Sequence, residues 1–204
     1  MGKILITWTT SWIWNFLANN LKDIFEIIWV WRSDNKIESI SFFKWDLKDE
    51  IFLKNISDNI SEIDYLIINA WVWYFDTFQN ISIDEDKEII ETNLISPIIL
   101  TKLLLPKIKQ WIIFIWSISS KKSWSFWASY AASKFWLRWF AMQLKNEIKW
   151  IKISIINPKI VKTNFHKNSK IEIVWKYKET SLEEILKVVK EIINWGEKRF
   201  EIDL

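Results

Sequence analysis

The chain has almost no glycine and no cysteine. Its 204 residues include two glycines, no cysteine and 17 tryptophans. Without cysteine there is no disulfide, no thiolate zinc site and no cysteine nucleophile, which is compatible with a reducing compartment. Glycine normally supplies about 7% of residues and forms the turns, helix ends and phosphate-binding loops that side chains obstruct. Together the two glycines and 17 tryptophans number 19, which would be an ordinary to slightly generous glycine content for this length.

Net charge and long apolar runs are also scarce. The formal charge is +3 and the basic residues are scattered, so neither nucleic acid nor a membrane surface is an expected partner. The most apolar long stretch, 93–106, is interrupted by Pro97 and Lys102 and is not expected to span a bilayer. The N-terminus has no signal-peptide pattern. We therefore expect a cytoplasmic protein that forms a single domain over residues 1–204.

Short apolar runs alternate with helical patterns along the whole chain. Runs rich in Ile, Leu and Val predict strands at 3–7, 25–30, 40–44, 64–70, 112–117, 152–158 and 200–204. Helical spacing of apolar residues predicts helices at 13–21, 48–60, 84–109, 128–149 and 182–193, with a bend at Pro97. This alternation predicts an α/β fold with a doubly wound parallel sheet. Ligands bind such a sheet beyond the carboxyl ends of its strands.

The first predicted strand is followed by a loop in which tryptophan stands where glycine is needed. Residues 6–14 read ITWTTSWIW, and glycine in place of each tryptophan gives T-G-T-T-S-G-I-G. This resembles the T-G-x-x-x-G-[IL]-G turn of the short-chain dehydrogenase/reductase family, which has a Rossmann fold. The resemblance implies that a dinucleotide is bound by Thr7, Trp8, Ser11, Trp12, Ile13 and Trp14. Glycine lets this turn approach the pyrophosphate, which an indole would obstruct.

Other tryptophans fall on the family's glycines in the same way. NAWVW at 69–73 resembles N-A-G-x-G, and SWSFWASYAASKFWLRWF at 123–140 resembles S-G-x-x-G-x-x-Y-x-x-S-K-x-G-L-x-G-F. Trp45 follows the third strand, and Trp111 and Trp150 stand where a glycine after a helix end is expected.

We interpret the tryptophans as glycines translated under the wrong genetic code. Some bacterial lineages read the codon UGA as glycine, whereas a common alternative code reads it as tryptophan. The Ile-, Lys-, Asn- and Phe-rich composition fits a low-GC source of this kind. The alternative is a chain that truly carries 17 tryptophans, as an aromatic-rich binding module unable to bind a dinucleotide.

The strongest part of the resemblance contains no tryptophan. Residues 130–134 read Tyr-Ala-Ala-Ser-Lys and match the family's Y-x-x-x-K, which places Tyr130 and Lys134 on one helix face. A cation beside a phenol favours the phenolate, so we expect the pKa of Tyr130 to move down from about 10. Ser117 precedes Tyr130 by thirteen residues, the family's spacing for the serine that bonds the substrate oxygen. The Ser119-Ser120 pair offers weaker alternatives.

The resemblance implies hydride transfer between a nicotinamide ring and a carbonyl or alcohol carbon. In the family's scheme Tyr130 gives or takes the proton, Lys134 holds the nicotinamide ribose, and Ser117 positions the substrate oxygen. Asn93 matches the asparagine whose backbone environment holds a water linked to the lysine. A dinucleotide-binding regulator without activity is a second alternative, against which the intact Ser117, Tyr130 and Lys134 argue.

The second predicted strand ends in Trp31-Arg32-Ser33, without the acid that bonds the ribose of NAD. Arg32 suits a 2′-phosphate, so NADP(H) is predicted in preference to NAD(H). The family pattern implies further cofactor contacts from Asp46, Leu47, Asn69, Ala70, Trp71, Pro158, Val161 and Thr163. Lys159 departs from this pattern, because the family has glycine there and the residue is not tryptophan.

The segment 164–180 is expected to cover the substrate pocket, and its lone His166 is expected to be a loop residue without a catalytic role. The implied partner is a small carbonyl or alcohol substrate. Because long helices often pair between subunits in this family, a homodimer or homotetramer is expected.

Overall fold

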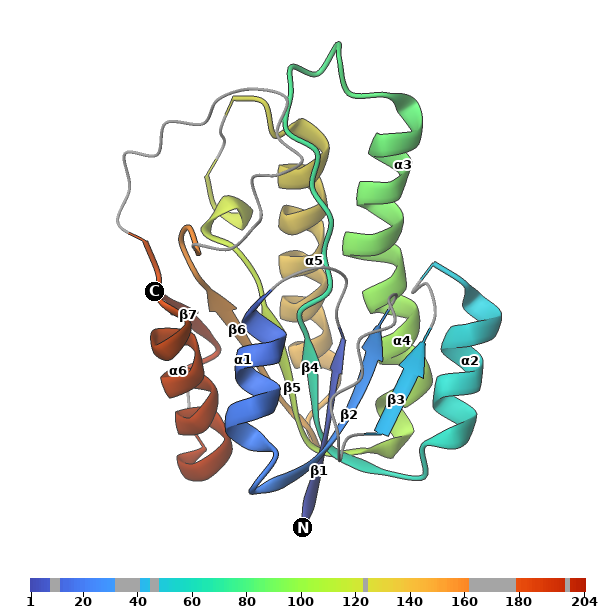
Figure 1. Cartoon of the computed structure of the whole chain (residues 1–204), viewed down its shortest axis with the longest axis vertical. Helices are drawn as coiled ribbons and strands as arrows, with labels where there is room; N and C mark the ends of the chain where they lie inside the picture. Colours follow the sequence, from blue (N-terminus) through green and yellow to red (C-terminus); the bar gives the residue numbers. More distant parts are fainter. Residues whose placement is uncertain (8–11, 32–40, 45–47, 123–124, 162–178, 197–198) are drawn as a thin grey trace.

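Seven parallel strands form one sheet in the order β3-β2-β1-β4-β5-β6-β7 (Figure 1). The computed structural model describes residues 1–7, 12–31, 41–44, 48–122, 125–161, 179–196 and 199–204. The strands are β1 Gly2–Thr7, β2 Phe25–Trp31, β3 Ser41–Lys44, β4 Ile63–Ile68, β5 Ile108–Ile115, β6 Lys152–Asn157 and β7 Glu201–Asp203. The doubly wound parallel sheet predicted from the sequence is confirmed. Its strand order reverses between β1 and β4, which is where such sheets bind ligands.

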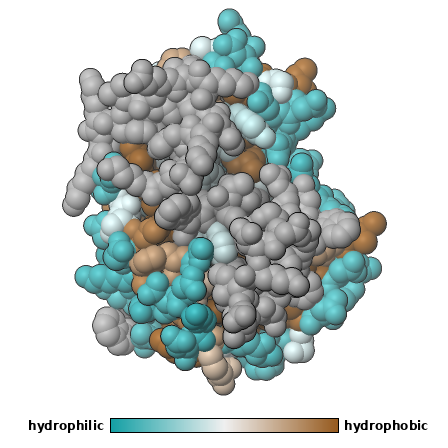
Figure 2. Space-filling view, viewed as in Figure 1, coloured by the Kyte–Doolittle hydropathy of each residue, from teal (hydrophilic) through white to brown (hydrophobic). Residues whose placement is uncertain are grey.

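Helices cover both faces of the sheet. They are α1 Trp12–Leu21, α2 Glu50–Asn59, α3 Ile83–Ile90, α4 Ser96–Leu104, α5 Ala128–Glu147 and α6 Leu182–Trp195. Helices α1 and α6 pack on one face, and α2, α4 and α5 pack on the other (Figure 1). Side chains of β4 alternate between the two apolar layers: Leu66 and Ile68 face α2, α4 and α5, whereas Tyr65 and Ile67 face α1 and α6. Mainly hydrophilic residues cover α2 and α3 on the face seen in Figure 2.

The predicted helix 84–109 is interrupted and ends early. It consists of α3, a π turn at Glu91–Ile95, α4 and a 3₁₀ turn at Leu105–Lys107. The backbone N–H of Ser96 and its hydroxyl both donate to the carbonyl of Glu91, five residues earlier. Pro97 has no N–H to donate and would clash with a regular turn, so the wider π turn just before it replaces the expected bend. By length and composition Ile83–Lys107 could cross a membrane, but core helices pass the same test and this one is partly buried.

At two positions where the sequence predicted a glycine after a helix end, the backbone does not have the conformation that requires glycine. Because β5 begins at Ile108, Trp111 lies inside a strand, where its Nε1 donates to Ser154 Oγ at 3.0 Å. Helix α5 ends with Ile148 in an extended conformation, so Trp150 is not a left-handed residue after a helix. Among the described residues, positive φ occurs at Gly196, which ends α6 with φ of 64°, and at Phe126, with φ of 69°. Gly196 therefore has the role expected of a glycine after a helix.

Candidate active site

The ends of β1 and β4 are joined where the strand order reverses. Thr7 is the last residue of β1, and its Oγ1 accepts hydrogen bonds from the backbone N–H groups of Asn69 and Ala70 at 3.2 and 3.4 Å. All three residues are buried. These predicted cofactor residues therefore meet at the edge of the sheet where a dinucleotide is expected.

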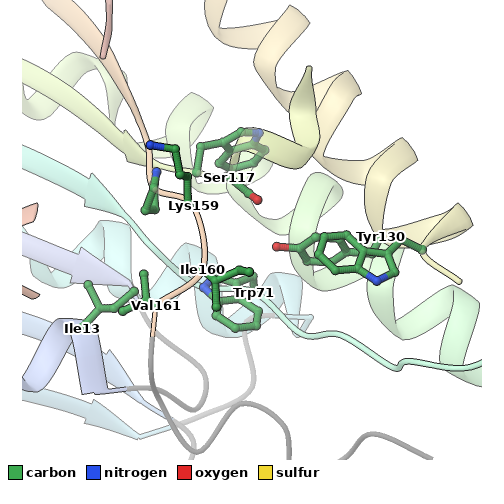
Figure 3. A pocket seen from close by; sticks show the side chains of 10 residues that line it. Ile13, Trp71, Ser117, Tyr130, Lys159, Ile160 and Val161 are labelled. Atoms are coloured by element: carbon green, nitrogen blue, oxygen red, sulfur yellow. The ribbon is translucent and has the colours of Figure 1, made fainter. Parts of the chain in front are cut away.

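A small pocket opens beyond the carboxyl ends of the same strands (Figure 3). Six predicted site residues line it: Ile13, Trp71, Ser117, Tyr130, Pro158 and Val161. The sequence did not identify four others as pocket residues: Trp116, Trp127, Lys159 and Ile160. The cavity measures about 60 Å³, which is room for roughly two water molecules. Three indoles thus occupy much of the place expected for the nicotinamide.

Several predicted cofactor residues lie outside the described part of the chain: Trp8, Ser11, Arg32, Asp46, Leu47 and Thr163. The predicted covering segment 164–180 is likewise described only at Glu179 and Thr180. Trp12 begins α1, but its side chain is not among those that the structure describes. Trp14 is only 5% exposed and belongs to the core layer of α1 and α6. The expectation that its indole crowds the cofactor site is wrong, because that side of α1 faces the sheet.

Ser117 and Tyr130 approach each other across the pocket. Their hydroxyl groups point toward one another in Figure 3, although Ser117 follows β5 and Tyr130 lies in the first turn of α5. Ser117 Oγ donates to Ser119 Oγ at 3.0 Å and accepts from the Ser119 N–H at 3.1 Å, which fixes its orientation. Of the three candidate serines in this turn, Ser117 lines the pocket, whereas Ser119 and Ser120 are 3% and 1% exposed.

Burial determines the proton affinity of Tyr130. It raises the pKa of the phenol well above its ordinary value, and the hydrogen bond with Ser117 offsets this only in part. The sequence had predicted a lowered pKa through the charge of Lys134. That prediction is wrong for this structure, because desolvation of the phenolate outweighs the other influences. Tyr130 is therefore protonated at neutral pH.

Lys134 lies one helical turn after Tyr130 and is completely buried. Its Nζ has no hydrogen-bond partner and lies over aromatic rings, 4.2 Å from the Trp116 ring centroid, 5.3 Å from that of Tyr130 and 5.7 Å from that of Trp71. Burial lowers the pKa of Lys134 to about 7. Attraction to the rings compensates part of the cost of burying the cation.

Asn93 holds the segment after β4 against α5. Its Oδ1 accepts from the Val72 N–H at 2.7 Å, while its Nδ2 donates to the Val72 carbonyl at 2.9 Å and to Ser133 Oγ at 3.2 Å. The residue is fully buried within the π turn. Its side chain thus acts on the position of its neighbours, one of which precedes Lys134 directly.

Two buried side chains beside the pocket lack polar partners within the described structure. Both side-chain polar atoms of Asn69 and the Nζ of Lys134 are unsatisfied. Buried polar atoms are normally hydrogen-bonded, so these groups fit a polar ligand at this edge. The polar groups suit a dinucleotide, but the cavity lined by Trp71, Trp116 and Trp127, at about 60 Å³, is small for its nicotinamide ring.

A cluster of charges that the sequence did not reveal joins the elements around the pocket. Glu201 on β7 accepts two hydrogen bonds from Arg138 on α5, each 2.8 Å long. It also accepts from Asn157 Nδ2 at the end of β6 at 2.7 Å, and it lies 3.1 Å from the Nζ of Lys121, which follows the Ser117 turn. Lys121 and Asn157 also bind Asp203.

This cluster affects both the proton affinity of Glu201 and the shape of the site. Burial alone would raise the pKa of Glu201, but hydrogen bonds from Arg138, Asn157 and Lys121 outweigh it and lower the pKa to about 2. The same bonds connect the Ser117 turn, α5 and the end of β6 to β7. Sequence distances of 44 to 82 residues separate the partners, so no local pattern could have identified the cluster.

We predict that Glu201→Gln lowers the free energy of unfolding at pH 7 by about 1–2 kcal/mol, because charge-assisted hydrogen bonds are lost. Glu201 is more acidic in the folded state, so its contribution is complete above about pH 4.5 and disappears as the pH falls toward 2. Urea denaturation at several pH values should therefore show a weaker acid dependence in the variant.

The control is Glu62→Gln, which removes an exposed ion pair with Lys109. Such pairs contribute little, so stability should change by less than about 0.5 kcal/mol. Equal effects of the two substitutions would contradict a special role for Glu201.

Known proteins share both sequence and fold with this chain. A family model described as short chain dehydrogenase matches residues 26–173. The chain is 35% identical over 113 residues to dehydrogenase/reductase SDR family member 7B of Bos taurus. That match covers 52% of this chain and 35% of the relative, so the chain corresponds to about a third of the relative's length.

Solved structures resemble nearly the whole chain. A short chain dehydrogenase family protein from Francisella tularensis superposes with a TM-score of 0.87 at 18% identity and covers 100% of this chain and 97% of its own. A 4-hydroxyisoleucine dehydrogenase complexed with NADH gives 0.85 at 20% identity, covering 100% and 96%. An alcohol dehydrogenase from Thermococcus sibiricus complexed with 5-hydroxy-NADP gives 0.82 at 19%, covering 99% and 95%. At such identities these structures show the shared fold. Because the family model covers well over half of the sequence, the chain belongs to the short-chain dehydrogenase/reductase family.

Proposed function

We propose that the protein is an NADP(H)-dependent reductase or dehydrogenase that acts on a small carbonyl or alcohol. The observation that carries this proposal is that Ser117 and Tyr130 line one pocket while the Nζ of Lys134 lies buried 5.3 Å from the Tyr130 ring centroid. They come from the loop after β5 and from α5, and the pocket lies where the strand order reverses.

The side chains have separable roles in this proposal. When bound to the glycine form, the cofactor would supply or accept the hydride. Tyr130, which is protonated at neutral pH, would donate its proton to the carbonyl oxygen, and Ser117 would orient that oxygen by a hydrogen bond. Lys134 would hold the ribose and, when charged, stabilise the phenolate left behind. Asn93 acts as a positioning residue through Val72 and Ser133.

We predict that Tyr130→Phe lowers kcat for carbonyl reduction by at least about 100-fold, because the proton donor is removed while the ring remains. Steady-state assays on a panel of ketones and aldehydes with NADPH measure this effect. Tyr65→Phe is the matched control, since that hydroxyl bonds Gln110 at 2.8 Å and does not line the pocket. Unchanged activity in Tyr130→Phe would refute the mechanism and leave the regulator alternative as the better explanation.

The preference for NADP(H) rests on the Arg32 cation and on the lack of an acid at the end of β2. The structural relatives do not decide between the cofactors, because one is complexed with NADH and another with an NADP derivative. We expect Arg32→Ala to weaken NADPH binding about tenfold and to leave NADH binding nearly constant, since only NADPH carries a 2′-phosphate. Fluorescence titration of each cofactor tests this, and an equal loss for both would contradict the assignment.

We further propose that the tryptophans are glycines in the native polypeptide. Three of them fill the pocket that a nicotinamide needs. Three others present large exposed indoles: Trp136 and Trp139 on α5 are 57% and 47% exposed, and Trp150 is 68% exposed. Glycine at the pocket positions would open the site, and glycine on α5 would let another helix approach closely. The ordinary φ angles of Trp111 and Trp150 give no support at those two places.

Protein purified from its natural source should absorb weakly at 280 nm for its size, because only tyrosines would then contribute strongly. Intact mass gives an independent measure. The mass of the native protein should be lower than that of the printed sequence by the difference between tryptophan and glycine at each of the 17 positions. The glycine form should bind NADPH, and the tryptophan form should not. Strong indole absorbance of the native protein would overturn the proposal and favour an aromatic-rich binding module.

The proposed partners follow from the surface. Phe135 on α5 and Ile95 of the neighbouring π turn are exposed, and the glycines proposed at positions 136 and 139 would let a second helix approach this face closely. Apolar helix faces of this kind support a homodimer or homotetramer. A scattered charge of +3 supports neither nucleic acid nor a membrane as a partner, and we propose a cytoplasmic location.

A further inference from the structure

One wall of the pocket carries a lysine in the place where the family has glycine. Pro158, Lys159, Ile160 and Val161 follow β6 and line the pocket together with Ser117 and Tyr130. Figure 3 shows Lys159 beside Ser117, on the side away from Tyr130. The cation is therefore next to the reacting centre but separated from the proton donor.

The backbone of this wall is fixed, which places the lysine. The N–H of Lys159 donates to Thr180 Oγ1 at 3.0 Å, and the N–H of Thr180 donates to the Ile160 carbonyl at 2.7 Å. Thr180 is 2% exposed. In contrast, the side chain of Lys159 is exposed, and its ammonium has no ion pair or hydrogen bond with any residue that the structure describes. Hydrogen bonds thus hold the backbone of Lys159, whereas its ammonium has no partner among the described residues.

None of the described residues that line the pocket is acidic. The other nearby cation, Lys134, is completely buried, so Lys159 is the charge that the described lining presents to a ligand. Glu179 lies at the edge of the wall, where it bridges Ile160, but it does not line the pocket. A cation in a lining without acids attracts an anionic ligand.

We propose that the substrate is a carbonyl or alcohol compound that bears an anionic group, a phosphate ester or a carboxylate, which Lys159 binds. This inference rests on the reductase function proposed above and adds the class of its substrate. Ser117 and Tyr130 hold the reacting oxygen at one end, and Lys159 binds the anion at the other. A lysine is a flexible point charge, so it accommodates either kind of anion. The glycine of the family at this position offers no such contact.

The test compares ketones that differ only in charge. Dihydroxyacetone phosphate is paired with dihydroxyacetone, and levulinate with its methyl ester, so that the phosphate and carboxylate arms are separate. The full chain, with glycine at the 17 positions, should give a higher kcat/KM for the charged member of at least one pair. In Lys159→Gln the ratio of kcat/KM for the charged ketone to kcat/KM for the neutral ketone should fall about tenfold. The fall should come mainly from a higher KM for the charged ketone, because its contact with the lysine cation is lost. Lys159→Arg should retain most of the ratio, and the exposed Lys122→Gln should retain all of it.

The outcomes separate this inference from the proposed function. If the full chain reduces the ketones but the ratio is the same in Lys159→Gln, the substrate class is wrong and the reductase stands. If Lys159→Gln raises the KM of NADPH and leaves the ratio constant, Lys159 binds cofactor and the inference also fails. If no ketone is reduced, the proposed function fails. The inference is then decided by thermal unfolding: stabilisation by the charged ketones that Lys159→Gln abolishes supports it, and no stabilisation overturns it.

Discussion

Parallel pairing of β1, β4, β5 and β6 is the constraint on which the rest of the molecule depends. Parallel strands bring all their carboxyl ends to one edge, and the change of direction between β1 and β4 leaves a crevice there. Thr7, Asn69, Ser117 and Pro158 each follow or end one of these four strands, so residues far apart in the sequence become neighbours. Tyr130 is then delivered to the same edge by α5, whose buried side packs on the sheet.

Burial at this edge changes what the side chains can do. Desolvation strengthens the hold of Tyr130 on its proton and weakens that of Lys134, so the proton affinities of the two groups move apart. The positive charge that the sequence predicted for Lys134 is only partial at neutral pH, because burial lowers its pKa to about 7.

Periodicity predicted the sheet and nearly every helix, because continuous apolar strands and amphipathic helices have strong local signals. Periodicity did not predict the π turn at Glu91–Ile95, which lies just before Pro97 and accommodates the lack of an N–H in that proline. Spacing also predicted that Ser117 and Tyr130 share a pocket with Lys134 close to Tyr130, since a turn and one helix connect the three residues. The position of Lys159 in the pocket and the Glu201 cluster could not be predicted, because both depend on contacts between strands distant in the chain.

At Trp14 and Trp111 the sequence motifs predict glycine, but the structure accommodates tryptophan at both positions. Each indole is accommodated in the core layer of α1 and α6, and Trp111 even finds an acceptor in Ser154. Trp71, Trp116 and Trp127 are different, since they take up the volume in which a ligand is expected. The physical conflict is therefore concentrated at the site, not spread over the fold.

The Glu201 cluster has a consequence for the order in which the molecule forms during synthesis. Lys121 and Arg138 emerge from the ribosome long before their carboxylate partners on β7, which lie 82 and 63 residues later. Until then the Ser117 turn and α5 can be formed but are not joined across the end of β6. The hydrogen bonds that join the Ser117 turn, α5 and the end of β6 can therefore form only after β7 has been synthesised.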